Sequence, residues 1–80
     1  MEIKVLGTGC ARCRKLYEEV EQAIRHSGIP ATLTKVEDLD GILAYGVMMT
    51  PALVIDEEVV SMGKVTKAAE IVTLIVNRTG

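Results

Sequence analysis

The chain has 80 residues, of which 49% are hydrophobic and 25% are charged, and its formal net charge at pH 7 is −2. This length fits one domain, residues 1–80, whose core must be aliphatic because the chain has two Tyr and no Phe or Trp. The balanced charge and the scarcity of aromatic side chains argue against nucleic-acid binding. No run reaches the roughly 18 apolar residues of a membrane span, and the start MEIKVLG does not have the pattern of a signal peptide. We therefore expect a cytoplasmic protein that binds neither nucleic acid nor membranes.

The first half of the chain predicts a strand, a helix and a second strand. The segment EIKVLG alternates apolar and charged residues, as a half-buried strand does. From Cys13 to Ile24 apolar residues recur every three or four positions, which predicts an amphipathic helix that ends before Gly28 and Pro30. Residues 31–37 alternate again and are rich in β-branched residues, so they predict the second strand.

A short helix and a hairpin are predicted next. The helix is capped by Asp38 or Asp40 and ends at Gly46. The hairpin joins an apolar run at residues 52–55 to residues 58–62 through a turn at DEE.

The last segment, residues 66–77, is the most ambiguous. Thr66 is a plausible helix N-cap, and Ala68, Ala69 and Glu70 favour a helix. The following IVTLIVN is rich in β-branched residues and would also suit a strand. We assign a helix, which gives the order β-α-β-α-β-β-α. The first two strands are then parallel, because a helix connects them in a right-handed crossover. The hairpin adds an antiparallel pair and completes a mixed four-stranded sheet in an α/β fold.

Both cysteines lie in GTGCARC, residues 7–13, where the first strand turns into the first helix. Cys10 and Cys13 are three positions apart, which puts their side chains on one helix face with Cβ atoms about 5–6 Å apart. A disulfide needs only a slightly closer approach. At a helix N-terminus the unpaired N–H groups lower the pKa of a thiol and so favour its reactive thiolate. Arg12 and Arg14 are expected to add to this effect, with the Arg14 side chain leaning over Cys10.

The cysteine pair alone leaves three readings open: a redox couple, a pair of metal ligands, or two small core residues. Tetrahedral zinc needs four ligands, and the single histidine, His26, is roughly 20 Å from Cys13 along the same helix at about 1.5 Å per residue. Zinc would therefore require a second chain. Copper(I) is a stronger alternative, because two thiolates suffice for it.

A family resemblance favours the redox reading. GTGCARC, the later TPALVID and the VVSMGKV before the last helix resemble the small thioredoxin/glutaredoxin-like redox-active disulfide proteins of archaea and bacteria. The resemblance spans essentially the whole chain. It implies a minimal thioredoxin-like fold with helices on both faces of the sheet. It also implies a monomer without a cofactor, served by an upstream reductase and acting on protein disulfides.

The resemblance also implies the roles of individual residues. Cys10 takes the place of the nucleophile and Cys13 that of the resolving thiol, and the two form the redox-active disulfide. Pro51 matches the cis-proline of the family, and the backbone of Thr50 would bind an extended substrate segment. Gly9 and Arg12 are also assigned to substrate binding. 

Several positions depart from the family pattern. The dipeptide between the cysteines is Ala-Arg, and no Trp precedes Cys10. No counterpart is evident for the buried acid that assists proton transfer in thioredoxins. Only one glycine, Gly63, stands where glutaredoxins have two, which argues against a glutathione pocket. Met48, Met49 and Met62 are assigned to the core in preference to an apolar rim for partners.

Three functional hypotheses follow. The leading one is a thiol–disulfide oxidoreductase in which Cys10 attacks a target disulfide and Cys13 resolves the mixed disulfide. The second is a copper(I)-binding, chaperone-like module of ferredoxin-like fold, which would require a strand at the C-terminus. The third is a thioredoxin-fold interaction protein without redox activity.

Overall fold

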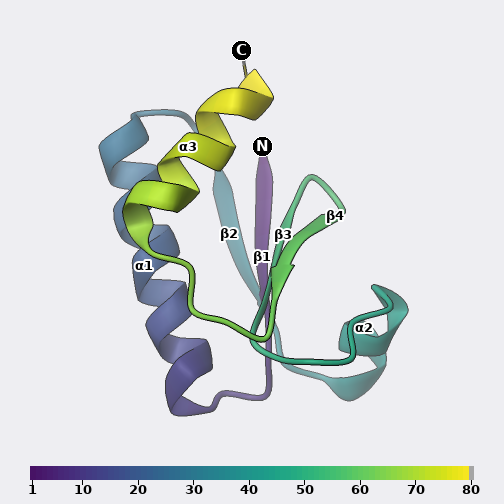
Figure 1. Ribbon diagram of the computed structural model, residues 1–80. Helices are drawn as coiled ribbons and strands as arrows, with labels where there is room; N and C mark the ends of the chain where they lie inside the picture. Colours follow the sequence, from purple (N-terminus) through teal and green to yellow (C-terminus); the bar gives the residue numbers. More distant parts are fainter. Residues whose placement is uncertain (80) are drawn as a thin grey trace.

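The computed structural model describes residues 1–79 and contains four strands and three helices in the expected order (Figure 1). They are β1 (Glu2–Leu6), α1 (Ala11–Ser27), β2 (Thr32–Val36), α2 (Leu39–Ala44), β3 (Ala52–Ile55), β4 (Glu58–Met62) and α3 (Ala68–Thr79). The prediction of an α/β fold with a mixed four-stranded sheet is confirmed.

The sheet has the strand order β2-β1-β3-β4. β1 pairs in parallel with β2 and antiparallel with β3, and β3 pairs antiparallel with β4. Val5, near the end of β1, lies between Lys35 of β2 and Leu53 of β3. The central strand β1 therefore delivers the loop that follows it, residues 7–10, to one end of the sheet.

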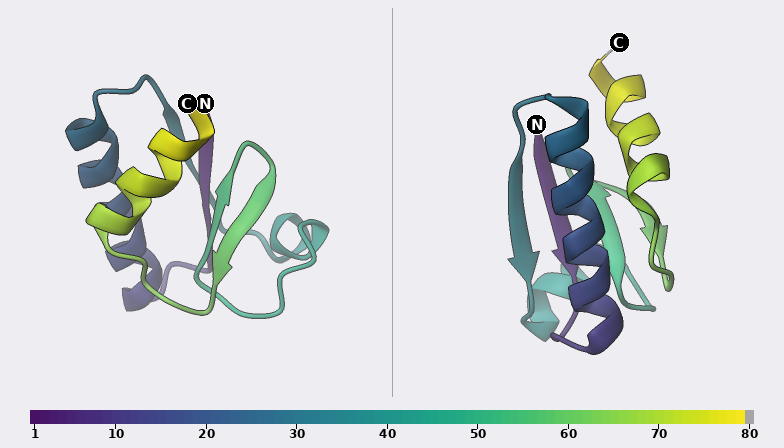
Figure 2. Two further views of the ribbon diagram at one scale, coloured as in Figure 1. Left: turned by 45° about the horizontal axis from the view of Figure 1, so that its top comes forward. Right: turned by 90° about the vertical axis from the view of Figure 1, so that its left-hand side faces the viewer.

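Helices cover both faces of this sheet. α1 and α3 lie side by side on one face, and α2 lies on the other (Figure 2). The buried side chains form one cluster on each face. The larger cluster, between the sheet and the two long helices, consists of Ile3, Val5, Leu16, Val20, Ala23, Leu53, Ile55, Ile71 and Ile75. The smaller cluster, on the α2 side, consists of Leu6, Ile42, Val47, Ala52 and Val54.

Local signals in the sequence account for the helix boundaries on either side of β2. α1 ends where Gly28 adopts a left-handed conformation, φ 68°, and its N–H donates to the carbonyl of Ile24. α2 begins after Asp38, whose carboxylate accepts a hydrogen bond of 2.7 Å from the N–H of Gly41. Of the two predicted caps, Asp38 is therefore the one used.

The hairpin turn is shorter than the expected DEE. Only Asp56 and Glu57 lie between the strands, both with positive φ, and Glu58 already belongs to β4. Two successive residues of positive φ give the primed turn that matches the twist of a two-residue hairpin. Glu57 is held by Lys4 of β1, whose ammonium nitrogen lies 2.6 Å from its carboxylate oxygen.

The C-terminal segment is helical, as assigned, but it is not capped as expected. α3 begins at Ala68, and Thr66 is buried before it, with its hydroxyl 3.2 Å from that of Ser61. The N–H of Ala68 donates instead to the Glu19 carboxylate of α1, at 3.0 Å. A helix at this position fits the thioredoxin-like arrangement and contradicts the ferredoxin-like alternative, which needs a strand here.

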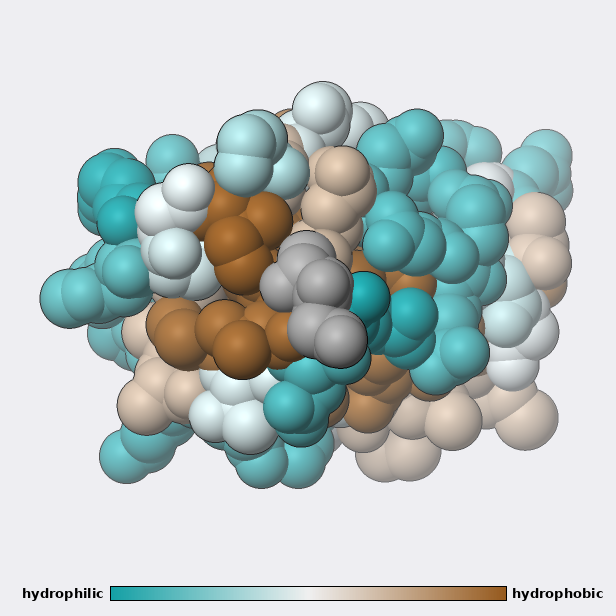
Figure 3. Space-filling view, turned by 90° about the horizontal axis from the view of Figure 1, so that it is seen from above, coloured by the Kyte–Doolittle hydropathy of each residue, from teal (hydrophilic) through white to brown (hydrophobic). Residues whose placement is uncertain are grey.

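The N-terminus and the end of α3 lie at the end of the sheet opposite to the start of α1 (Figure 1). Seen from that end, hydrophobic side chains gather near the middle of the surface and hydrophilic side chains lie on both sides of them (Figure 3). Within residues 1–79, no helix combines the length and the apolar character needed to cross a membrane.

Candidate functional site

Cys10 and Cys13 lie at the start of α1, in the loop-to-helix turn that follows β1. Cys10 is the N-cap residue, with an extended backbone, and its sulfur accepts a hydrogen bond of 3.3 Å from the N–H of Cys13. The two sulfur atoms are 2.6 Å apart, in a hydrogen bond between free thiols. Cys10 is exposed, whereas Cys13 is buried, with 5% of its surface accessible. One sulfur therefore faces solvent and the other lies directly behind it.

This arrangement shifts the pKa values of the two thiols in opposite directions. The pKa of Cys10 is lowered, first by the hydrogen bond from the Cys13 side chain and then by that from the Cys13 backbone N–H. The pKa of Cys13 is raised, first by burial and then by its hydrogen bond with Cys10. Because the thiolate is the nucleophilic form of cysteine, Cys10 is the more reactive of the two.

Gly7 lets the buried sulfur pack against the end of β1. A Cβ atom at this position would overlap the sulfur of Cys13 and would lie 4.0 Å from the Cα of Pro51. The N–H of Gly7 also donates to the carbonyl of Val36, at the end of β2. The sequence analysis assigned no role to Gly7 beyond its place in the segment where the first strand turns into the first helix. Its position between the first strand and the cysteine pair was the available signal. A residue there lies close to the cysteines, and the sulfur of Cys13 leaves no room for a Cβ atom.

Pro51 lies close to Gly7 and to the buried sulfur of Cys13, because both approach the point where a Cβ of residue 7 would stand. The Thr50–Pro51 peptide bond is cis, the Pro51 side chain is fully buried, and Thr50 is exposed. The chain thus brings residue 51 next to residues 7 and 13, although more than 35 positions separate them in the sequence. The fold thus brings Thr50 and Pro51, two of the residues assigned to substrate binding, next to the cysteine pair.

Arg12 contacts the loop that follows β4. Its guanidinium donates a hydrogen bond of 2.7 Å to the carbonyl of Gly63, and the N–H of Gly63 donates one of 2.8 Å to the carbonyl of Pro51. These two bonds connect the start of α1 to the segment of Pro51. No local sequence signal predicts this contact, since Arg12 and Gly63 are 51 positions apart.

Gly9 and Arg14 line a pocket of about 180 Å³ on the Cys13 side of the site. Its wall also includes Cys13, Tyr17, Lys35 and Glu37, so α1 and the end of β2 enclose it. Arg14 lines this pocket together with Cys13, and its placement over Cys10 stays a prediction. Hydrogen bonds to the Cys10 sulfur, rather than the charge of either arginine, account for the lowered pKa of that thiol.

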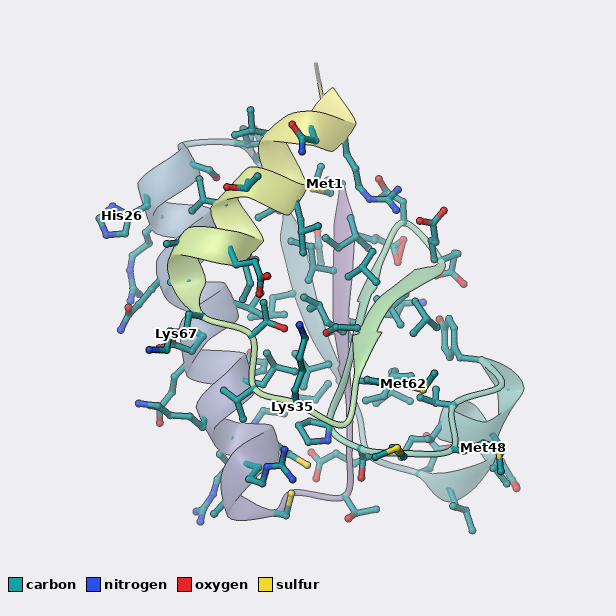
Figure 4. The ribbon with its side chains drawn as sticks, viewed as in Figure 1. Met1, His26, Lys35, Met48, Met62 and Lys67 are labelled. Atoms are coloured by element: carbon teal, nitrogen blue, oxygen red, sulfur yellow. The ribbon has the colours of Figure 1, made fainter. Side chains whose placement is uncertain are left out.

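An apolar rim flanks the site on the α2 side. Met48 is 93% exposed, Met49 59% and Met62 50%, so the assignment of these three residues to the core is wrong. Met48 and Met62 lie on the same side of the molecule as α2 (Figure 4). Met48 also lines a shallow groove together with residues that include Thr50, Leu39 and Leu43.

His26 lies at the far end of α1 from the cysteine pair, as its position in the sequence predicts (Figure 4). Among residues 1–79, no three or more His, Cys, Asp or Glu side chains gather in a way that could hold a metal ion.

Comparisons with known proteins agree with this geometry. A family model described as a thioredoxin domain matches residues 1–76. A protein named thioredoxin from Methanothermobacter thermautotrophicus is 38% identical over 71 residues, which cover 89% of this chain and 92% of that protein. A protein named thioredoxin from Methanocaldococcus jannaschii is 38% identical over 69 residues, which cover 86% of this chain and 79% of that protein. With its sheet order, its helix-capping Cys10 and the adjacent cis-Pro51, the chain belongs to the thioredoxin family.

Proposed function

We propose that this member of the thioredoxin family is a thiol–disulfide oxidoreductase that acts on protein disulfides. The observation that carries the proposal is the pairing of an exposed Cys10, whose pKa is lowered, with a buried Cys13 directly behind it. Family membership supports a thioredoxin-like redox role. The proposed reaction uses only the thiols of Cys10 and Cys13 and requires no bound cofactor.

The reaction proceeds by two thiol–disulfide exchanges. The Cys10 thiolate attacks one sulfur of the substrate disulfide, so that a mixed disulfide forms and the other substrate sulfur leaves as a thiolate. Cys13 then loses its proton and attacks the Cys10 sulfur, which releases the second substrate thiolate. The substrate gains two electrons, and the protein is left with a Cys10–Cys13 disulfide. An upstream dithiol reductase restores the reduced pair.

The cis-Pro51 segment serves as the binding site for the substrate chain in this proposal. Thr50 is exposed beside the cysteine pair, and an extended segment can add to exposed backbone groups as a further strand. The methionine rim, formed by the exposed side chains of Met48, Met49 and Met62, flanks this site on the α2 side. It offers adaptable apolar contacts to a bound substrate chain.

Trapping of the mixed disulfide tests the mechanism. A Cys13→Ser variant cannot resolve the intermediate, so it should accumulate a covalent complex with a disulfide-bonded protein such as insulin. The complex should be released by dithiothreitol and should be absent in the Cys10→Ser variant, which keeps Cys13 but lacks the exposed thiol. Mass spectrometry of the adduct identifies the cysteine that carries the substrate.

The proposal fails if Cys10 of the Cys13→Ser variant reacts with iodoacetamide but forms no mixed disulfide. Retention of copper(I) by a wild-type protein that forms no reversible Cys10–Cys13 disulfide would instead support a metal-binding role, because two soft thiolates suffice for that ion.

A further inference from the structure

Arg12 occupies a position from which it can contact any substrate of the cysteine pair. It lies between Cys10 and Cys13 in the sequence and is exposed at the start of α1. Its hydrogen bond to the carbonyl of Gly63 holds the guanidinium at the loop after β4, and Gly63 in turn is bonded to Pro51. The guanidinium is therefore fixed next to the proposed binding site of the substrate chain.

The charge at this position is unfavourable for the helix itself. Asp and Glu stabilise the first turn of a helix and cations oppose its dipole, yet the first turn of α1 has no acidic residue and contains Arg12. In the described part of the chain, the ion pairs involve Lys4, Lys64 and Arg78, and none of them neutralises Arg12. A residue that breaks a local rule at a functional site is a candidate for a functional role.

The guanidinium also keeps donors for a ligand. Arginine has five N–H donors in a planar fork that matches the two oxygens of a carboxylate. One donor of Arg12 bonds to the Gly63 carbonyl, and the side chain remains exposed to solvent. A carboxylate on a bound segment can therefore pair with this side chain without displacing it from Gly63.

We propose that Arg12 selects protein disulfides that have an Asp or Glu next to the attacked cysteine. This inference rests on the proposed oxidoreductase function and names its substrate class. The acidic residue of the substrate lies on the α1 side of the site in this arrangement. The pocket beside Cys13 carries the carboxylate of Glu37, which would repel an acidic residue bound there.

Two peptides that differ in one residue test the preference. Each has a single intramolecular disulfide, and the residue beside one cysteine is Glu in the first and Gln in the second. The pre-reduced protein is mixed with each peptide in a single turnover at low ionic strength, and the second-order rate constants are compared. We expect the Glu peptide to react about fivefold faster, the size of effect typical of an exposed charge-assisted pair, and the preference to shrink in 1 M NaCl.

Variants of two arginines assign the preference to a residue. Arg12→Gln should react equally with the two peptides, whereas Arg25→Gln, a change of an exposed arginine in the last turn of the same helix, should keep the wild-type ratio. The ratio of two rates on one protein cancels any change in Cys10 reactivity, so a merely structural role of Arg12 would not alter it. Arg12→Lys should keep part of the preference, because it keeps the charge but not the fork.

The outcomes separate the two proposals. A wild-type protein that reduces both peptides at equal rates overturns the role of Arg12 and leaves the oxidoreductase function standing. A preference that survives in Arg12→Gln also overturns it. A protein that reduces neither peptide contradicts the oxidoreductase function, and the selectivity falls with it.

Discussion

At the scale of single residues, the two cysteines differ because their positions at the helix start differ. The sulfur of Cys10, at the N-cap, faces solvent and receives two hydrogen bonds from Cys13, one from the thiol and one from the backbone. The sulfur of Cys13 packs against Gly7, where no Cβ atom intervenes, and is buried. Hydrogen bonds stabilise the thiolate of Cys10 and burial disfavours that of Cys13. A single turn of backbone thus prepares one thiol to attack and keeps the other protonated.

Removal of the Cys13 thiol should raise the pKa of Cys10. The thiol hydrogen bond is the largest cause of the lowered value, so Cys13→Ala should move the pKa of Cys10 toward the ordinary thiol value of about 8.5. It should remain below that value, because the N–H of residue 13 still donates to the sulfur. The rate of alkylation of Cys10 by iodoacetamide, followed from pH 5 to pH 10, measures this pKa.

Cys13→Ser provides the matched control for this measurement. Its hydroxyl can still donate to the Cys10 sulfur, so the pKa of Cys10 should lie between the values in wild type and in Cys13→Ala. A pKa that is the same in wild type and Cys13→Ala would show that the contact between the two sulfur atoms does not activate Cys10.

At the scale of elements, α3 depends on α1 for its first turn. The N-terminal N–H groups of a helix have no partner within the helix, and the Glu19 carboxylate of α1 accepts the one from Ala68. Its negative charge also suits the positive end of the α3 dipole. The bond between the two helices thus fixes where α3 begins and how it lies against α1.

Replacement of Glu19 should therefore destabilise the protein through α3. Glu19→Ala leaves the Ala68 N–H without its acceptor and should lower the free energy of unfolding by about 1 kcal/mol, the typical value of a lost cap. Urea denaturation followed by circular dichroism measures this change. Glu18→Ala is the control, because Glu18 is the exposed neighbour on the same helix and its loss should change the free energy by less than about 0.5 kcal/mol. Equal effects of the two substitutions would show that the cap does not stabilise α3.

The sequence predicts those elements whose signals are local. The alternation in β1 and β2, the apolar stripe of α1, its stop at Gly28 and the Asp38 cap are all readable from neighbouring residues, and the structure has them. The cap of α3 could not be predicted, because its acceptor is 49 positions away on another helix. The contact from Arg12 to Gly63 is hidden for the same reason. The exposed methionines were misread because apolar character alone does not tell a core residue from a rim residue.

At the scale of the whole molecule, stability and reactivity depend on different parts of the fold. The larger buried cluster fills the space between the sheet and the helices α1 and α3, whereas the cysteine pair lies at the start of α1, after the end of β1. Ile71 of α3 is completely buried in this cluster and does not line the pocket beside Cys13. Damage to the cluster should therefore weaken the fold without changing the chemistry of the site.

Ile71→Ala tests this separation. Removal of a buried isoleucine side chain should lower the free energy of unfolding by about 3 kcal/mol, a large share of the roughly 4–12 kcal/mol expected for a chain of this length. Thr73→Ala, an exposed position on the same helix, should change it by less than about 0.5 kcal/mol. In buffer without urea, the pKa of Cys10 measured by alkylation should equal the wild-type value in both variants. A shift of that pKa in Ile71→Ala alone would mean that the packing of α3 sets the geometry of the cysteine pair through α1, and the two properties would then not be separable.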